Sequence, residues 1–245
     1  MVFRRAKPSS WRRCKSALAF MLAVLAGSSG HAQDAPENCT HDAMLVFDSS
    51  GSMAEMGFNG LDTPRIFSAR EALQRALPDI TPVRRVGLMV YGPGPAEVCA
   101  NVDLLLRPAP DAAVKIIHAV SQLTPGGQTP LTVSVKRAAE VLGAPDKPGT
   151  VVLVTDGKET CGGTPCRLAA NLAADAPGLV VHVIGFQVRG DFFAWRSSAE
   201  AESYTDSNTV ARCLADRTSG LYVSTETVDE LTAALRQTLG CAAIG

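Results

Sequence analysis

The stretch Met44-Leu45-Val46-Phe47-Asp48-Ser49-Ser50-Gly51-Ser52 sets the architecture of this chain, because an apolar strand runs directly into a group of oxygen-bearing side chains. Such a continuous apolar run is typical of a strand that is covered on both faces of a parallel sheet. The wholly apolar residues 151–154 form a second run of this kind, and Asp156 follows it. Asp48 and Asp156 therefore stand at the carboxyl ends of two predicted strands, where open α/β sheets bind their ligands.

Strands and helices alternate through the rest of the chain, which predicts an α/β fold with a mostly parallel central sheet and helices on both faces. The predicted strand 102–106 follows the strand before it through a short loop without a helix, so we expect an antiparallel strand at the edge. The last helix is preceded by Thr227 and contains Glu230, the pattern of a capping box. The other predicted strands are 86–91, 180–184 and 221–223, and the predicted helices are 63–77, 112–123, 130–142, 166–174, 209–217 and 228–239.

Five oxygen-bearing side chains in three separated segments are candidate metal ligands. They are hard ligands without sulfur or imidazole, which suits Mg²⁺ or another hard divalent cation, with Mn²⁺ and Ca²⁺ as alternatives. Asp and Ser are also common turn residues, so the first of these segments alone is equally compatible with an ordinary turn. The five residues are Asp48, Ser50 and Ser52 after the first strand, Thr129 in a Gly-rich loop, and Asp156 after the strand 151–154.

The first 32 residues have the pattern of a secretory signal peptide. Residues 1–15 carry six basic side chains and no acid, an apolar run follows at 17–26, and small residues end at Ala32. This run is shorter than the roughly 20 residues that cross a bilayer, so we expect cleavage rather than a stable membrane anchor. The prediction is a signal peptide at 1–32, one domain at 33–245, and a periplasmic or secreted protein.

The charge of the chain argues against nucleic acid as a partner. The whole chain has 23 basic and 24 acidic residues, but the signal segment contains six of the basic ones. The remaining domain is therefore acidic, with a net charge of −7, whereas contacts to phosphate groups need Lys and Arg.

Six cysteines remain once Cys14 is removed with the signal, and an even number predicts disulfides in an oxidising compartment. Zinc is the weaker interpretation, since the cysteine spacing has no matching Cys or His pair. Cys39 opens the first strand and Cys241 ends the last helix, so we expect these two to pair at the edge opposite the metal ligands. The other four allow Cys161–Cys166 with Cys99–Cys213, or Cys99–Cys161 with Cys166–Cys213.

These segments resemble the von Willebrand factor type A domain and its metal-ion-dependent adhesion site. The family pattern is Asp-x-Ser-x-Ser after the first strand, a Thr in a Gly-rich loop and an Asp after the fourth strand. The residues that match it, in order, are Asp48, Ser50, Ser52, Thr129 and Asp156. The resemblance covers about residues 40–240 and implies a Rossmann-like domain; the segments 126–131, 155–161 and 183–186 are similar to exported bacterial members.

The resemblance implies an adhesion-type binding module rather than an enzyme. In the family the aspartates act partly through bound water, and an Asp or Glu of a partner protein completes the shell of the cation. The hydroxyls of serine and threonine are neutral ligands, so they do not quench its charge. A metal-dependent hydrolase is the first alternative, although the chain shows no Asp-x-Asp pair, Gly-x-Ser-x-Gly or His base near the motif. A structural domain with a non-functional site is the second.

Three aromatic residues, Phe192, Phe193 and Trp195, stand in a polar segment. We hypothesise that they form a partner-binding surface beside the metal; packing over a helix end is the equal alternative. Lys158 and Glu159 follow Asp156 and are expected to be solvated loop charges, with a place at the rim of the site as the alternative. His182 is expected to be a core histidine within an apolar strand.

Overall fold

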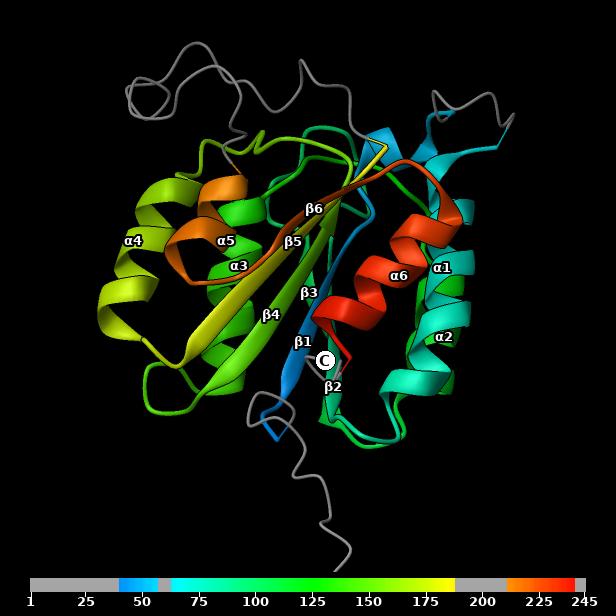
Figure 1. Cartoon of the computed structure of the whole chain (residues 1–245). Coiled ribbons are helices and arrows are strands. Elements are labelled where there is room, and N and C mark those ends of the chain that lie inside the picture. The colour runs from blue at the N-terminus through cyan, green and yellow to red at the C-terminus, as the bar shows by residue number, and fades with distance from the viewer. Residues whose placement is uncertain (1–39, 57–62, 188–210, 241–245) are drawn as a thin grey trace, which may run out of the picture. The chain divides into compact units, whose positions relative to one another are not determined.

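The structure is a computed structural model that describes residues 40–56, 63–187 and 211–240. Within these ranges the chain forms a six-stranded sheet in the order β3-β2-β1-β4-β5-β6, in which β3 alone runs antiparallel to its neighbour. Helices cover both faces (Figure 1), so the predicted fold class and the antiparallel edge strand are confirmed. The strands are β1 (Ala43–Asp48), β2 (Val86–Tyr91), β3 (Val102–Ala109), β4 (Gly149–Thr155), β5 (Leu179–Phe186) and β6 (Tyr222–Thr225). The helices are the 3-10 helix η2 (Gly51–Ala54), α1 (Arg65–Ile80), α2 (Ala113–Ser121), α3 (Leu131–Leu142), α4 (Pro165–Asp175), α5 (Arg212–Arg217) and α6 (Val228–Thr238).

Strand β1 contributes to the core on both sides of the sheet, and all six of its residues are buried. Successive side chains of a strand point to opposite faces. Leu45 and Phe47 pack into the core beneath α1, α2 and α6. Met44 and Val46 pack into the core beneath α3, α4 and α5. Figure 1 shows these two helical layers on either side of the sheet. The central strand is therefore fixed from both faces before it reaches Asp48.

The direction of the chain across the sheet changes at β1. The connection through α1 leads from β1 to β2 on one side, whereas β4, β5 and β6 follow one another on the other side. Phe47 pairs with Val154, so Asp48, the last residue of β1, and Asp156, which follows β4, lie at the carboxyl ends of neighbouring strands. Such a switch point is where α/β sheets of this kind form ligand sites.

Several element boundaries differ from those predicted by a few residues, among them those of α1 and β3. The helix predicted over 63–77 is α1, which begins at Arg65 with Pro64 at the N-cap and no capping side chain, and which ends at Ile80. Strand β3 continues to Ala109, three residues beyond the prediction, after a shift in its register against β2. Pro108 is tolerated there because an edge strand has one side without a hydrogen-bonding neighbour. The predicted capping box of α6 is confirmed.

The buried Arg84 connects three segments at the amino-terminal ends of the central strands, which is the end of the sheet opposite Asp48. Its guanidinium donates hydrogen bonds to the carbonyl oxygens of His41 (3.2 Å) and Leu239 (3.1 Å) and to the hydroxyl of Thr150 (2.5 Å). Burial lowers the pKa of Arg84 to about 10, so the group remains charged at neutral pH. Arg84 thus joins the start of β1, the start of β4 and the end of α6.

Replacing Arg84 by Met is expected to lower the free energy of unfolding by roughly 2–4 kcal/mol, because buried acceptors lose a charged donor. Arg85→Met is the matched control. Arg85 is half exposed and pairs with Asp42 at the surface, where an ion pair contributes about 0–1 kcal/mol. Urea unfolding of both variants measures the difference, and equal losses would contradict this account of Arg84.

Candidate metal centre

The Asp48 carboxylate is the buried centre of the candidate site, and it has no exposed surface. Its Oδ2 accepts hydrogen bonds from the hydroxyl of Tyr91 at the end of β2 (2.7 Å) and from the hydroxyl of Thr155 at the end of β4 (2.8 Å). Its Oδ1 accepts a hydrogen bond from the backbone N–H of Ser50 (2.8 Å). Donors from three segments therefore orient this carboxylate. Sequence reasoning did not single out Tyr91 or Thr155, although both are polar residues at the ends of the strands that flank β1.

Ser52 connects the loop after β1 with the loop after β4. Its hydroxyl donates a hydrogen bond to Oδ1 of Asp156 (2.6 Å), a residue 104 positions away in the sequence. The hydroxyl oxygen of Ser50 lies 3.2 Å from that of Ser52. The 3-10 helix η2 follows Ser50 and turns the chain so that these hydroxyls lie together. Three of the predicted ligands are therefore in direct contact, and Asp48 orients the backbone of the same loop.

Thr129 lies near Ser52 beside Gly157. A Cβ atom at Gly157 would lie 3.7 Å from the hydroxyl oxygen of Ser52 and 3.9 Å from that of Thr129. The two hydroxyls thus approach the same point from different loops. Thr129 and Asp156 are each only 5% exposed. The structure consequently brings all five predicted residues to one end of β1 and β4.

Arg65 is a member of the site that sequence reasoning noticed only as part of a helix start. Its guanidinium donates hydrogen bonds to Oδ2 of Asp156 (3.1 Å) and to the carbonyl oxygen of Ser52 (2.8 Å). The residue is 4% exposed. One signal for it was available: a positive charge at the first residue of a helix opposes the helix dipole, so such a residue needs an acidic partner nearby.

Two buried carboxylates dominate the electrostatics of the site. Burial, and next the negative charge of Asp48, raise the pKa of Asp156 to about 7, although Ser52 and Arg65 act in the opposite direction. Among the described residues, no group of three or more His, Cys, Asp or Glu side chains could hold a metal. Ser50, Ser52 and Thr129 add hydroxyl oxygens to the two carboxylates at this point. Two carboxylates and three hydroxyls supply oxygen only, which fits a hard divalent cation.

Glu159 differs from its prediction as a solvated charge, because it is only 2% exposed. Its Oε2 accepts a hydrogen bond from the N–H of Thr132 in the first turn of α3 (2.8 Å), and its Oε1 accepts one from the N–H of Cys161 (2.9 Å). A carboxylate at the start of a helix is stabilised by the unpaired N–H groups and the helix dipole. His182 lies in β5 but is only half-buried, so it is not the core histidine that was predicted; its Nδ1 accepts a hydrogen bond from the N–H of Leu221.

The structure contains the disulfides Cys99–Cys161 and Cys166–Cys213. The second of the two predicted arrangements is thus confirmed, and the pairings Cys161–Cys166 and Cys99–Cys213 are wrong. The physical reason is that Cys166 is buried within α4, where it meets Cys213 of α5, whereas Cys161 lies in the preceding loop and meets the loop after β2.

Several predictions concern residues outside the described ranges. They are the Cys39–Cys241 disulfide, the signal peptide at 1–32, and the aromatic surface of Phe192, Phe193 and Trp195. In the ranges that the structure describes, no helix is both long and apolar enough to cross a membrane.

Comparison with known proteins shows which sequences and structures this chain is similar to. A model of the von Willebrand factor type A domain matches residues 43–159, which include all five candidate ligands. The chain is also similar to YwmD, an uncharacterized protein of Bacillus subtilis (strain 168), with 29% identity over 153 residues. That match covers 58% of this chain and 66% of YwmD, slightly less than two thirds of its length.

Solved structures share the fold at low sequence identity. The pilus adhesin SpaC from Lactobacillus rhamnosus GG gives a TM-score of 0.57 at 16% identity, over 83% of this chain and 30% of SpaC. Proximal thread matrix protein 1 from the mussel byssus, solved with zinc in its MIDAS motif, gives a TM-score of 0.53 at 17% identity. That match covers 84% of this chain and 46% of the mussel protein.

Asp156 predicts how the free energy of unfolding depends on pH when a chelator keeps the protein free of metal. Its pKa is about 7 in the folded protein against 3.8 for an ordinary aspartate, so the folded state binds the proton more tightly. The bound proton stabilises the fold fully below about pH 4, and this stabilisation is lost as the pH rises through 7. We therefore expect the free energy of unfolding to fall through this group between pH 4 and 7, by at most about 1.4 kcal/mol per pH unit.

The variant Asp156→Asn isolates this contribution, because an amide does not titrate. His182 acts in the opposite direction: burial and the charge of Arg84 lower its pKa to about 4, so its contribution to stability rises with pH from 4 to 6.5. Both proteins keep His182, so the difference between their urea-unfolding curves removes its effect. A difference that stays constant from pH 4 to 7 would show that Asp156 is not perturbed.

Proposed function

Because the chain contains a domain of the von Willebrand factor type A family, we propose that it binds a partner protein through a divalent cation. The observation that carries this proposal is the contact between Ser52 and Asp156, which joins two segments of the family motif across 104 residues. The partner would be a protein or peptide that offers an Asp or Glu carboxylate. The proposed ligands of the cation are Asp48, Ser50, Ser52, Thr129 and Asp156.

Mg²⁺ is the cation that we propose, with Mn²⁺ and Ca²⁺ as alternatives. Zinc occupies the corresponding motif in the mussel protein, yet zinc in proteins favours nitrogen and sulfur ligands. The oxygen-only donor set of this chain favours a harder ion.

Charge balance explains how such a site would attract a carboxylate. Asp48 and Asp156 together carry two negative charges when ionised, and the guanidinium of Arg65, 3.1 Å from Asp156, offsets one of them. Ser50, Ser52 and Thr129 add neutral hydroxyls. A bound divalent cation would leave this buried group with a net charge of about +1, and would supply the positive centre that a partner carboxylate recognises.

A binding function is favoured over hydrolysis. Hydrolysis would need a base or nucleophile aimed at the cation. Of the three described histidines, His41 lies before β1 at the opposite end from Asp48, His118 is an exposed residue of α2, and His182 is held within the sheet by Leu221. None of these three is hydrogen-bonded to a proposed ligand of the cation. An enzyme remains the alternative class, and no particular observation of the site favours it.

We further propose that the protein acts in an oxidising compartment outside the cytoplasm. The two disulfides support this, since such bonds persist in exported proteins and are rare in reducing compartments. The predicted signal peptide at 1–32 would provide the route. Phe192, Phe193 and Trp195 remain our hypothesis for a partner-binding surface.

Calorimetric titration of Mg²⁺ into chelator-treated protein tests the proposed site. We expect binding by the parent and a loss of about 100-fold or more in affinity for Asp48→Asn, because a buried ligand loses its charge. Asp42→Asn is the control, since Asp42 precedes β1 and pairs with Arg85 at the opposite end. A folded parent that binds neither Mg²⁺ nor Mn²⁺ would sink the proposal. Equal binding by Asp48→Asn would place the cation elsewhere.

Acetate tests whether the bound cation recognises a carboxylate. When Mn²⁺ is bound to the protein, it increases the relaxation rate of solvent water protons. Acetate is expected to reduce this increase, because the positive centre attracts the anion. Acetamide, which has a similar shape and no charge, is the matched control. The expected result is an effect of acetate at concentrations where acetamide has none. If the two act equally, the carboxylate part of the proposal fails.

A further inference from the structure

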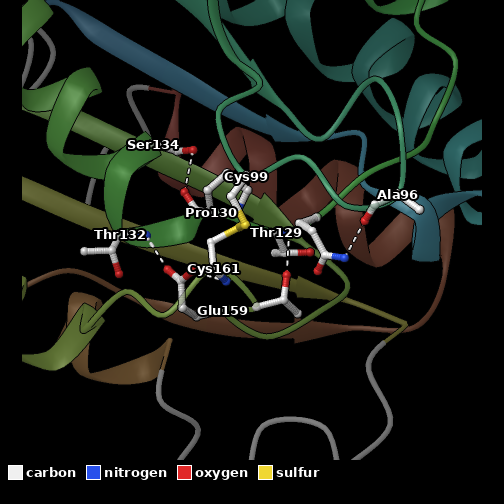
Figure 2. Close-up of a disulfide and its surroundings, with 10 residues drawn as sticks. Ala96, Cys99, Thr129, Pro130, Thr132, Ser134, Glu159 and Cys161 are labelled. Atoms are coloured by element: carbon white, nitrogen blue, oxygen red, sulfur yellow. Dashed lines mark hydrogen bonds between the residues drawn. A yellow bond between two sulfur atoms is a disulfide. The ribbon is translucent and has the colours of Figure 1, made fainter.

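Three consecutive residues after β4 each attach to a different element around Thr129. Glu159 binds the start of α3, Thr160 binds the backbone of Thr129, and Cys161 forms a disulfide with Cys99 of the loop after β2. Figure 2 shows these attachments gathered around Thr129 and Pro130. We refer to residues 159–161 as the clamp. The family motif contains none of them, and the site described above leaves Thr160 and the disulfide without a function.

Thr160 holds Thr129 by a pair of hydrogen bonds. Its hydroxyl accepts a hydrogen bond from the N–H of Thr129 (2.8 Å), and its N–H donates one to the carbonyl oxygen of Thr129 (3.1 Å). The clamp lies three to five residues beyond Asp156 in the same loop. A short segment with two hydrogen bonds to Thr129 thus connects the two proposed ligands Thr129 and Asp156.

The disulfide fastens the clamp to the loop that supports the other side of Thr129. Gly127 has φ +63°, and a Cβ atom there would lie 2.4 Å from the carbonyl oxygen of Gly92, so the two loops are in close backbone contact. The side-chain amide of Gln128 donates a hydrogen bond to the carbonyl oxygen of Ala96. Cys99 belongs to this same loop after β2 and joins Cys161. The segment before Thr129 is thereby held between two loops that are covalently joined.

We propose that the clamp positions the hydroxyl of Thr129 for the cation and thereby sets the affinity of the site. This inference rests on the proposed metal-binding function. Glu159 fixes the position of the clamp on α3, Thr160 transmits it to Thr129, and the Cys99–Cys161 disulfide prevents the loops from separating. These are positioning residues, since none of them is a proposed ligand. Residues that orient metal ligands typically change metal affinity by 10- to 100-fold when they are replaced.

Thr160→Val is the first test, because it removes the hydroxyl acceptor and keeps the shape of the side chain. Thr160 is exposed, so the substitution is expected to leave the protein folded. We expect the Kd for Mg²⁺, measured by calorimetry, to rise by about 10-fold or more. Thr160→Ser keeps the hydroxyl and is expected to retain an affinity within about 3-fold of the parent. Loss in both variants, or in neither, would overturn the assignment of this hydroxyl.

The two disulfides provide a matched pair of variants. Cys99→Ser with Cys161→Ser is expected to weaken Mg²⁺ binding by about 10-fold or more. Cys166→Ser with Cys213→Ser removes a bond between α4 and α5 and is expected to leave the Kd unchanged, even though it lowers the melting temperature. Melting temperatures in EDTA separate a general loss of stability from a change at the site.

The outcomes distinguish this inference from the proposed function. A parent that does not bind Mg²⁺ or Mn²⁺ refutes the metal site itself and the clamp with it. The clamp alone is refuted if the parent binds Mg²⁺, Asp48→Asn does not bind it, and both Thr160→Val and the Cys99/Cys161 variant bind it with the Kd of the parent. A drop in affinity that merely follows the melting temperature, and that the Cys166/Cys213 variant shares, would also refute it.

Discussion

The burial of two carboxylates at adjacent strand ends is the constraint on which the rest of the site depends. Desolvation and their mutual repulsion raise the pKa of Asp156 to about 7, so the fold carries a cost at this edge. The sheet order makes that cost tolerable, because it places β1 between β2 and β4. Each neighbour ends in a hydroxyl donor, Tyr91 or Thr155, that points at Asp48. Burial raises the pKa of Tyr91 well above its usual range, so this donor keeps its proton.

Helix α1 shows how far this constraint reaches into local structure. A basic residue at the first position of a helix opposes the dipole, and α1 has neither a capping side chain nor an acidic residue in its first turn. Arg65 nevertheless stands there, because its guanidinium lies between Asp156 and the carbonyl oxygen of Ser52. The charge of the site thus overrides the preference of the helix. Local conflicts of this kind are expected where a chain serves function rather than stability.

The sequence predicted what depends on repeated local patterns. Apolar runs predicted β1 and β4, and the residue types after them predicted which side chains meet at the strand ends. It did not predict the contacts of Glu159, because a carboxylate in a loop has no periodicity and its partner lies in another loop. The choice of disulfides depended on the direction in which α4 presents Cys166, which the cysteine spacing does not contain.

The packing of the sheet does not by itself hold Thr129 and Asp156 in position. Thr129 and Asp156 stand on loops, and loops are less constrained than the strands they leave. Both Thr160 and Cys99 are exposed, so their bonds to Thr129 and Cys161 add little to the packing of either core. The hydrogen bonds between Thr160 and Thr129 and the Cys99–Cys161 disulfide therefore act mainly on the geometry of the loops that they join. Because these loops carry Thr129 and Asp156, the surface bonds act on the separation of these two residues, whereas the buried donors Tyr91, Thr155 and Arg65 orient the two carboxylates of the candidate site.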